Sequence, residues 1–225
     1  VFHPTNLVLP LFSSRPATSE VMDRLVFLQV VLIGLGSVFL ARGFGFGCLG
    51  SVAASLVISH AGFVVSHLCH LPVICALAAG LWMLGALVRA VRDLDVRWSL
   101  VAGLCLACSI FAGHAQTTLF VCYGAAAGGG LLAACHARRA RSWRRLGTGL
   151  TQCVLAFVVG GFAALVQVLP TMVLLANSSR SILYPDQAML FSFPPRAFPG
   201  LWFPALYHPM PWRLGDGLGY AAHTM

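Results

Sequence analysis

Residues 25–41 read LVFLQVVLIGLGSVFLA, an apolar run without a charged residue that ends at Arg42. A membrane-spanning helix needs about 20 predominantly apolar residues to cross about 30 Å of hydrocarbon. Similar runs cover residues 43–66, 71–88, 117–135 and 146–169, and a shorter one covers residues 98–112. Together these runs predict an all-α fold, a polytopic transmembrane helical bundle with about six spans.

The composition favours the same class of protein. Of the 225 residues, 59% are hydrophobic and only 9% are charged, whereas a soluble domain carries about a quarter charged residues. A water-soluble fold of this size has no means of burying so much apolar surface. The chain opens with Val1, shows no signal peptide and ends at Met225 after a stretch rich in Gly and Pro. We therefore expect a fragment of a longer protein.

The basic residues indicate how the spans are oriented. All 14 are arginines, against 6 acidic residues, and nine of the arginines gather in alternate connectors between the runs. The three arginine connectors hold Arg42; Arg89, Arg92 and Arg97; and Arg138, Arg139, Arg141, Arg144 and Arg145. Since short basic loops stay on the cytoplasmic side, we expect an integral plasma (inner) membrane protein with these connectors inside. The local clustering of charge argues against a nucleic-acid partner.

This orientation divides the chain into three parts. Residues 1–24 form an extracytoplasmic N-terminal segment, residues 25–169 form the membrane region, and residues 170–225 form an extracytoplasmic loop. The last part alternates prolines with aromatic residues. Because aromatic rings settle at the headgroup level, we expect this loop to contain short interfacial helices.

Glycine and cysteine are frequent inside the runs. Small residues let membrane helices approach closely, and we expect this role for Gly43, Gly45, Gly47, Gly50, Gly124 and Gly128 to Gly130. No strand or lysine accompanies them, as a phosphate loop would require. Cys105 and Cys108 form a CxxC within an apolar run, where we expect packing rather than metal binding.

Two polar positions on the extracytoplasmic side are candidates for substrate binding. His114 and Gln116 lie in a short turn between two runs, where an imidazole and an amide can bind a phosphate or a sugar hydroxyl; the alternative is a capped helix junction. Arg180 lies in NSSRS. Its planar guanidinium suits a phosphate, and the alternative is an arginine that extends to lipid headgroups.

Three further sets of residues have a chemical and a structural interpretation. His67, Cys69 and His70 form a cluster that would bind a divalent metal if further ligands joined it; the alternative is a pair of helix ends. Asp186, in YPDQ, suits an acid or a metal ligand, and Pro-Asp is also ordinary turn chemistry. Asp93 and Asp95 resemble a carboxylate pair, but neighbouring arginines favour charge balance.

Five islands of sequence resemble the YfhO-like bacterial membrane proteins. They are FHPTNLVLPLF (residues 2–12), SHAGFVVSHLCHLP (59–72), FAGHAQTTLFVCYG (111–124), VQVLPTMVLLANSSRS (166–181) and FSFPPRAFPGLWFP (191–204). The last three are the more specific. One departure is Ala115, where a GHPQ-like turn would have proline.

That family is similar to the C-type glycosyltransferase superfamily, and the resemblance implies an activity. It implies transfer of a sugar from a polyprenyl-phosphate donor to an envelope glycan or lipid acceptor on the extracytoplasmic side, within the membrane lipid. The base is expected in an external loop that would precede Val1, so no catalytic residue is assigned. The expected substrate-binding residues are His114, Gln116, Arg180, His67, His70 and Asp186, with a divalent metal left open as a cofactor.

A second function stays open at this point. A lipid or polysaccharide transporter of the flippase type would use glycine-rich helices for gating and the external aromatic loop for lipid contact. The sequence does not decide between this role and the transferase.

Overall fold

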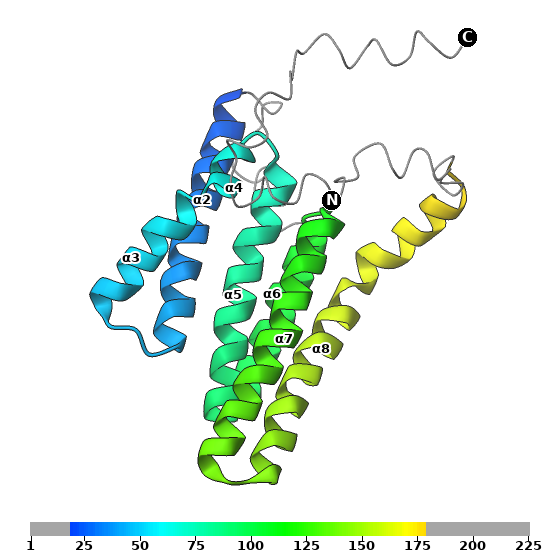
Figure 1. Cartoon of the computed structure of the whole chain (residues 1–225). Helices are drawn as coiled ribbons and strands as arrows, with labels where there is room; N and C mark the ends of the chain where they lie inside the picture. Colours follow the sequence, from blue (N-terminus) through cyan, green and yellow to red (C-terminus); the bar gives the residue numbers. More distant parts are fainter. Residues whose placement is uncertain (1–18, 179–225) are drawn as a thin grey trace, which may run out of the picture. The chain divides into compact units, whose positions relative to one another are not determined.

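A computed structural model describes residues 19–178 of the chain, and these residues form helices without a strand (Figure 1). The helices are α2 (Ser19–Gly43), α3 (Cys48–Ser59), α4 (Gly62–Ser66), α5 (Leu71–Asp93), α6 (Val96–Phe111), α7 (Ala115–Ala140) and α8 (Trp143–Ala176). The predicted all-α class is confirmed.

Five segments of the described part are long and apolar enough to cross a membrane. They are Glu20–Gly43, Cys48–Ser66, Leu71–Asp93, Ala115–Ala140 and Trp143–Ala176. The remaining apolar helix, α6, has 16 residues, which corresponds to about 24 Å. The chain is therefore a polytopic helical bundle with five long apolar segments and one shorter helix, close to the six runs of the sequence.

The predicted second run contains a break. Helix α3 ends at Ser59 and α4 begins at Gly62. At the break the Ser59 hydroxyl donates to the Ser55 carbonyl (2.7 Å), and His60 Nδ1 lies 3.0 Å from the Leu56 carbonyl oxygen. Such side-chain bonds to the backbone compete with the helical ladder, which accounts for a break that apolarity alone does not indicate.

The ends of two helices differ from the apolar runs. Helix α2 begins at Ser19 with a polar first turn, in which Glu20 pairs with Arg24. Helix α8 continues beyond residue 169 to Ala176, with Pro170 inside it. The expected boundary at residues 169 and 170 therefore falls within a helix, and the rest of the predicted loop lies outside the described residues.

The three arginine connectors lie at one end of the bundle, which we call the arginine end. Arg92 Nη1 donates to the Gly43 carbonyl (3.0 Å) at the end of α2, and Arg145 Nη2 donates to the Arg92 carbonyl (3.1 Å) at the end of α5. The connectors at residues 60–70 and 112–114 lie at the other end (Figure 1). The alternate arrangement predicted from the sequence thus brings the arginines together.

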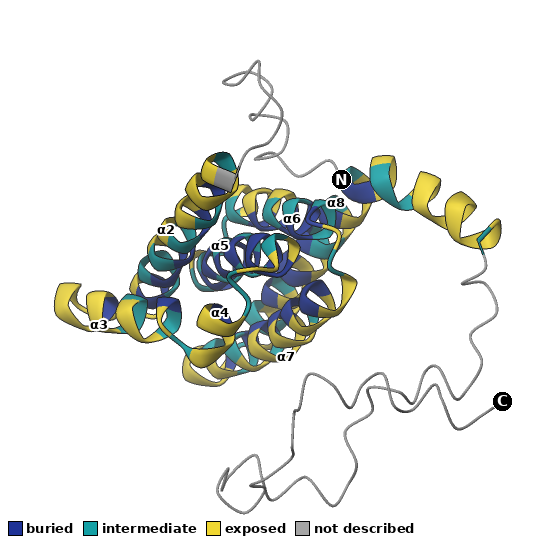
Figure 2. Ribbon diagram, turned by 90° about the horizontal axis from the view of Figure 1, so that it is seen from above, coloured by how far each residue is buried: buried dark blue, intermediate teal, exposed yellow. Residues whose placement is uncertain are grey.

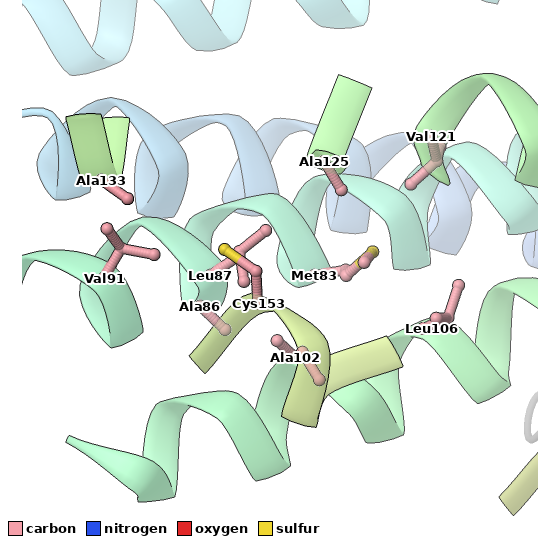
Figure 3. Close-up of a cluster of buried hydrophobic side chains, with 11 residues drawn as sticks. Met83, Ala86, Leu87, Val91, Ala102, Leu106, Val121, Ala125, Ala133 and Cys153 are labelled. Atoms are coloured by element: carbon pink, nitrogen blue, oxygen red, sulfur yellow. The ribbon is translucent and has the colours of Figure 1, made fainter. Parts of the chain in front are cut away.

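Helix α5 lies at the centre and carries most of the core. Met83, Leu87 and Val91 of this helix pack against α6, α7 and α8 (Figure 3). Their partners in the cluster include Ala102, Leu106, Val121, Ala125, Ala133 and Cys153. The outer faces are apolar and exposed instead (Figure 2), as at Leu49 (84% exposed). An apolar outer surface of this extent suits lipid rather than water.

Glycines at the helix crossings explain how closely these helices approach. A Cβ atom on Gly85 would lie 2.4 Å from Phe39, and one on Gly160 would lie 2.9 Å from the Gly103 carbonyl oxygen. Of the glycines predicted for this role, Gly43 and Gly129 do face a neighbouring helix. Within residues 19–178 the other predicted glycines have no neighbouring helix against their Cβ positions, namely Gly45, Gly47, Gly50, Gly124, Gly128 and Gly130, so for these the close-approach role stays a prediction. Gly45 serves a turn, with φ of +89°.

Some buried polar side chains bond to a neighbouring helix, and others, such as Ser37, bond to their own helix. The Ser99 hydroxyl of α6 donates to Gln152 Oε1 of α8, and the Ser109 hydroxyl donates to the Ala76 carbonyl of α5 (3.1 Å). Gln29 of α2 is fully buried, and within residues 19–178 neither the nitrogen nor the oxygen of its amide has a hydrogen-bond partner. An unpaired buried amide costs about 1–3 kcal/mol, so Gln29 weakens the packing of α2.

Candidate functional site

A groove of about 360 Å³ opens at the end opposite the arginines, between α6, α7 and α8. We call it the Gln167 groove. It is lined by Ile110, Gly113, Ala115, Thr118, Leu119, Cys122, Gln167, Val168, Thr171 and Met172. The groove lies beside the turn at residues 112–114, where the sequence predicted a binding site.

Helix α8 contributes four of the residues that line the groove. Gln167 Nε2 donates to the Ile110 carbonyl (3.2 Å) and so joins α8 to the end of α6. Pro170 follows three residues later, and every residue from 169 to 176 is exposed. Proline removes a backbone donor and bends a helix. Residues on both sides of this proline, Gln167, Val168, Thr171 and Met172, line the groove.

The lining is apolar apart from a few uncharged groups. Thr118 is buried and bonded to Ser109 Oγ (3.0 Å), and the Thr171 hydroxyl donates to the Gln167 carbonyl (2.7 Å). None of the residues that line the groove carries a carboxylate, an imidazole or a guanidinium. Such a surface suits a hydrocarbon chain, and the Gln167 amide and the two threonine hydroxyls are bonded within the bundle.

His114 lies at the edge of this groove, between the lining residues Gly113 and Ala115. It is the N-cap of α7: its Nδ1 accepts from the Thr117 N–H (3.2 Å) and lies 2.7 Å from the Thr117 hydroxyl. The capped helix junction that the sequence offered as an alternative is therefore present. Ala115 is the first residue of α7, a position that also tolerates proline, so its departure from the GHPQ-like pattern leaves the helix start intact.

Gln116 is exposed in the first turn of α7 and does not line the groove. The structure thus places His114 at the groove and leaves Gln116 on the neighbouring surface. Its predicted role in binding stays a prediction.

His67 and His70 lie in the connector between α4 and α5. His67 Nδ1 lies 2.8 Å from the Phe63 carbonyl oxygen, and its ring stacks on Phe63. His70 Nδ1 lies 3.2 Å from Cys69 Sγ, and the two imidazole rings are 5.7 Å apart. Within residues 19–178 no three metal-ligating side chains converge. The local bonds fit the alternative, in which these residues end one helix and begin the next.

The remaining sequence candidates fall into two groups. Arg180 and Asp186 lie outside the described residues. Asp93 forms an ion pair with Arg92 (2.7 Å), and Asp95 caps α6 by accepting from the Arg97 N–H (2.9 Å). Charge balance and helix capping therefore account for the two carboxylates at the arginine end.

Sequence reasoning missed most of the groove. Thr118, Gln167 and Thr171 were not among the predicted binding residues, although all three lie in the islands of resemblance. The amide of Gln167, near the end of the apolar run 146–169, was the available indication, since polar residues inside membrane helices are costly and often functional.

Comparison with known proteins adds no relative to this description. No protein-family model, no curated protein and no solved structure matches the chain.

Proposed function

We propose that this chain is the membrane part of a glycosyltransferase that takes a sugar from a polyprenyl-phosphate donor and passes it to a cell-envelope acceptor. One observation carries the proposal: the Gln167 groove has apolar walls and lies beside His114, at the end opposite the arginines. A polyprenyl phosphate has the same division, an apolar chain and a polar head. The resemblance to the YfhO-like proteins supports the activity.

The orientation of the bundle supports the side on which the reaction occurs. Short basic loops are kept in the cytoplasm, and the arginine connectors share one end. The groove then opens toward the extracytoplasmic layer. Polyprenyl-linked sugars presented on that side would reach it from within the membrane.

The residues of the groove would bind and orient the donor. The polyprenyl chain would lie against Leu119, Val168 and Met172. The phosphate and the sugar would then lie near Gln167 and His114. In the proposed reaction a carboxylate, which is assigned to no residue of this chain, removes the proton from the acceptor hydroxyl, whose oxygen attacks the anomeric carbon. The bond from that carbon to the phosphate oxygen breaks, and polyprenyl phosphate leaves with both electrons.

A lipid or polysaccharide transporter remains the second candidate, and one observation favours it. None of the residues that line the groove carries a carboxylate or an imidazole, the groups that most often transfer protons in enzymes. A transporter needs only to bind and release its lipid. Both candidates require the groove to hold a lipid chain, and transfer of a labelled sugar separates them.

The proposal is tested by filling the groove. The protein is placed in liposomes with a photoreactive polyprenyl phosphate. We expect Val168→Trp to lower crosslinking of the lipid to the protein at least tenfold, because the indole fills the space that the polyprenyl chain would occupy. Val166→Trp is the matched control: Val166 lies on the same helix, is 67% exposed and does not line the groove. Equal crosslinking of the two variants would show that the polyprenyl chain does not bind in the Gln167 groove.

A second experiment separates the two roles of His114. His114→Ala removes an N-cap and is expected to cost about 1 kcal/mol of stability, whereas His114→Asn restores a good cap. If the imidazole binds the donor, the Asn variant recovers the melting temperature but keeps less than a tenth of the sugar transfer. Full transfer by the Asn variant would show that His114 only caps α7.

A further inference from the structure

A second cavity lies at the arginine end, where α7 turns into α8. It has a volume of about 540 Å³, and we call it the arginine cleft. Ala134, Ala137 and Leu146 form its apolar floor, while Arg138, Arg141 and Trp143 stand around it. The cleft is formed by a single helical hairpin and is separate from the Gln167 groove.

The turn between the helices accounts for the position of the two arginines. Arg141 ends α7 in the left-handed conformation, with φ of 49°, and its N–H donates to the Arg138 carbonyl (3.2 Å). For a residue other than glycine this conformation costs about 1–2 kcal/mol. The turn places Arg138 and Arg141 beside the same cleft. Position 141 therefore carries an arginine in a backbone conformation that glycine adopts more easily.

The positive charge of this connector is not neutralised by the described part of the chain. Within residues 19–178 the two ion pairs are Glu20 with Arg24 and Asp93 with Arg92, and Asp95 accepts from a backbone N–H. Arg138 and Arg141 form neither of these pairs. Two guanidinium groups beside an apolar floor therefore form a site that suits a ligand with both a negative charge and a hydrocarbon chain.

The position of the cleft along the helices points to the membrane surface. It joins the last turns of Ala115–Ala140 to the first turns of Trp143–Ala176, both long enough to span a membrane. Trp143 is 86% exposed beside it, and tryptophan prefers the headgroup level of a bilayer. The arginines are thus set where lipid phosphates lie, and the apolar floor is set where acyl chains begin.

We propose that the arginine cleft binds an anionic glycerophospholipid. The guanidinium groups of Arg138 and Arg141 hold the headgroup phosphate through charge-assisted hydrogen bonds, and an acyl chain lies along Ala134, Ala137 and Leu146. Basic pockets between membrane helices bind anionic headgroups in this way. A nucleic acid or an acidic soluble protein would match the charge but would leave the apolar floor uncovered.

The test compares phosphatidylglycerol with phosphatidylcholine by native mass spectrometry of the whole chain. We expect Arg138→Gln/Arg141→Gln to bind phosphatidylglycerol about thirtyfold more weakly than the unchanged chain, from about 1 kcal/mol for each arginine. Arg97→Gln/Arg139→Gln removes the same charge from exposed positions outside the cleft and is expected to change binding less than threefold. Binding of phosphatidylcholine stays weak in all three.

A third variant keeps every charge and fills the floor. Ala134→Phe is expected to weaken phosphatidylglycerol binding at least tenfold while circular dichroism shows unchanged helix content. Equal losses in the two arginine double variants would mean that net charge alone attracts lipid and would overturn the proposal. So would unchanged binding by Ala134→Phe, or displacement of the lipid by inorganic phosphate at equal concentration.

Discussion

Gly160→Val is expected to lower the free energy of unfolding of the chain by about 3 kcal/mol, the upper part of the range for overpacking. Gly160 lies where α8 crosses α6, and a Cβ there would be 2.9 Å from the Gly103 carbonyl oxygen and 2.7 Å from Leu106 Cδ2. Gly103 is equally confined, with a Cβ position 2.8 Å from the Ala156 carbonyl oxygen. Because backbone blocks the space on both sides, the helices themselves must separate.

The neighbouring glycine supplies the control for this experiment. Gly161 has no atom within 4 Å of its Cβ position, so Gly161→Val is expected to leave stability within about 0.5 kcal/mol, as at exposed surface positions. Thermal unfolding in detergent micelles, followed by circular dichroism, compares the two. Similar melting temperatures for the two variants would contradict the crossing of α6 and α8 described here.

Arg89→Ala is expected to destabilise the chain by about 3 kcal/mol, since hydrogen bonds to a charged group and a cation–π contact are lost together. Arg89 Nη1 donates to the carbonyls of Phe39 and Gly85, both at 2.9 Å, and its guanidinium carbon lies 3.7 Å from the centre of the Phe39 ring. Trp98 of α6 lies on the same guanidinium, at 5.5 Å. One side chain therefore joins α2, α5 and α6.

The comparison for Arg89 is Arg97→Ala, an exposed arginine at the same end of the bundle. We expect that change to shift stability by less than about 0.5 kcal/mol. Arg89→Lys should recover only part of the loss, because an ammonium lacks the planar group that stacks on an aromatic ring. If Arg89→Ala and Arg97→Ala unfold alike, Arg89 does not join the three helices.

Apolarity predicted which parts of the chain are helices, because a run such as residues 71–88 has no other way to satisfy its backbone within lipid. It predicted their ends less well. The first turn of α2 holds charged residues, and α8 passes through Pro170, so neither extension is visible in an apolar run. The break at His60 depends on local side-chain bonds, which hydropathy does not measure.

The predicted site was partly accessible from the sequence. His114 was identified because a histidine in a short turn is chemically unusual, and capping was foreseen as its alternative role. The walls of the Gln167 groove were not identified, since the groove depends on how α6, α7 and α8 pack together. Likewise, the sequence supplied the glycines but not the faces they occupy: Gly129 packs against Leu87, whereas Gly128 faces open space.

The orientation of the bundle is the claim on which both proposed sites depend, and cysteine accessibility in intact cells tests it. Two single-cysteine chains are needed: one keeps the exposed Cys69 of the α4–α5 connector, and the other carries Ala140→Cys at the exposed end of α7. A membrane-impermeant maleimide is predicted to label the first chain in intact cells and the second only after the membrane is opened. Labelling of the Ala140→Cys chain in intact cells, with Cys69 protected, would contradict the account.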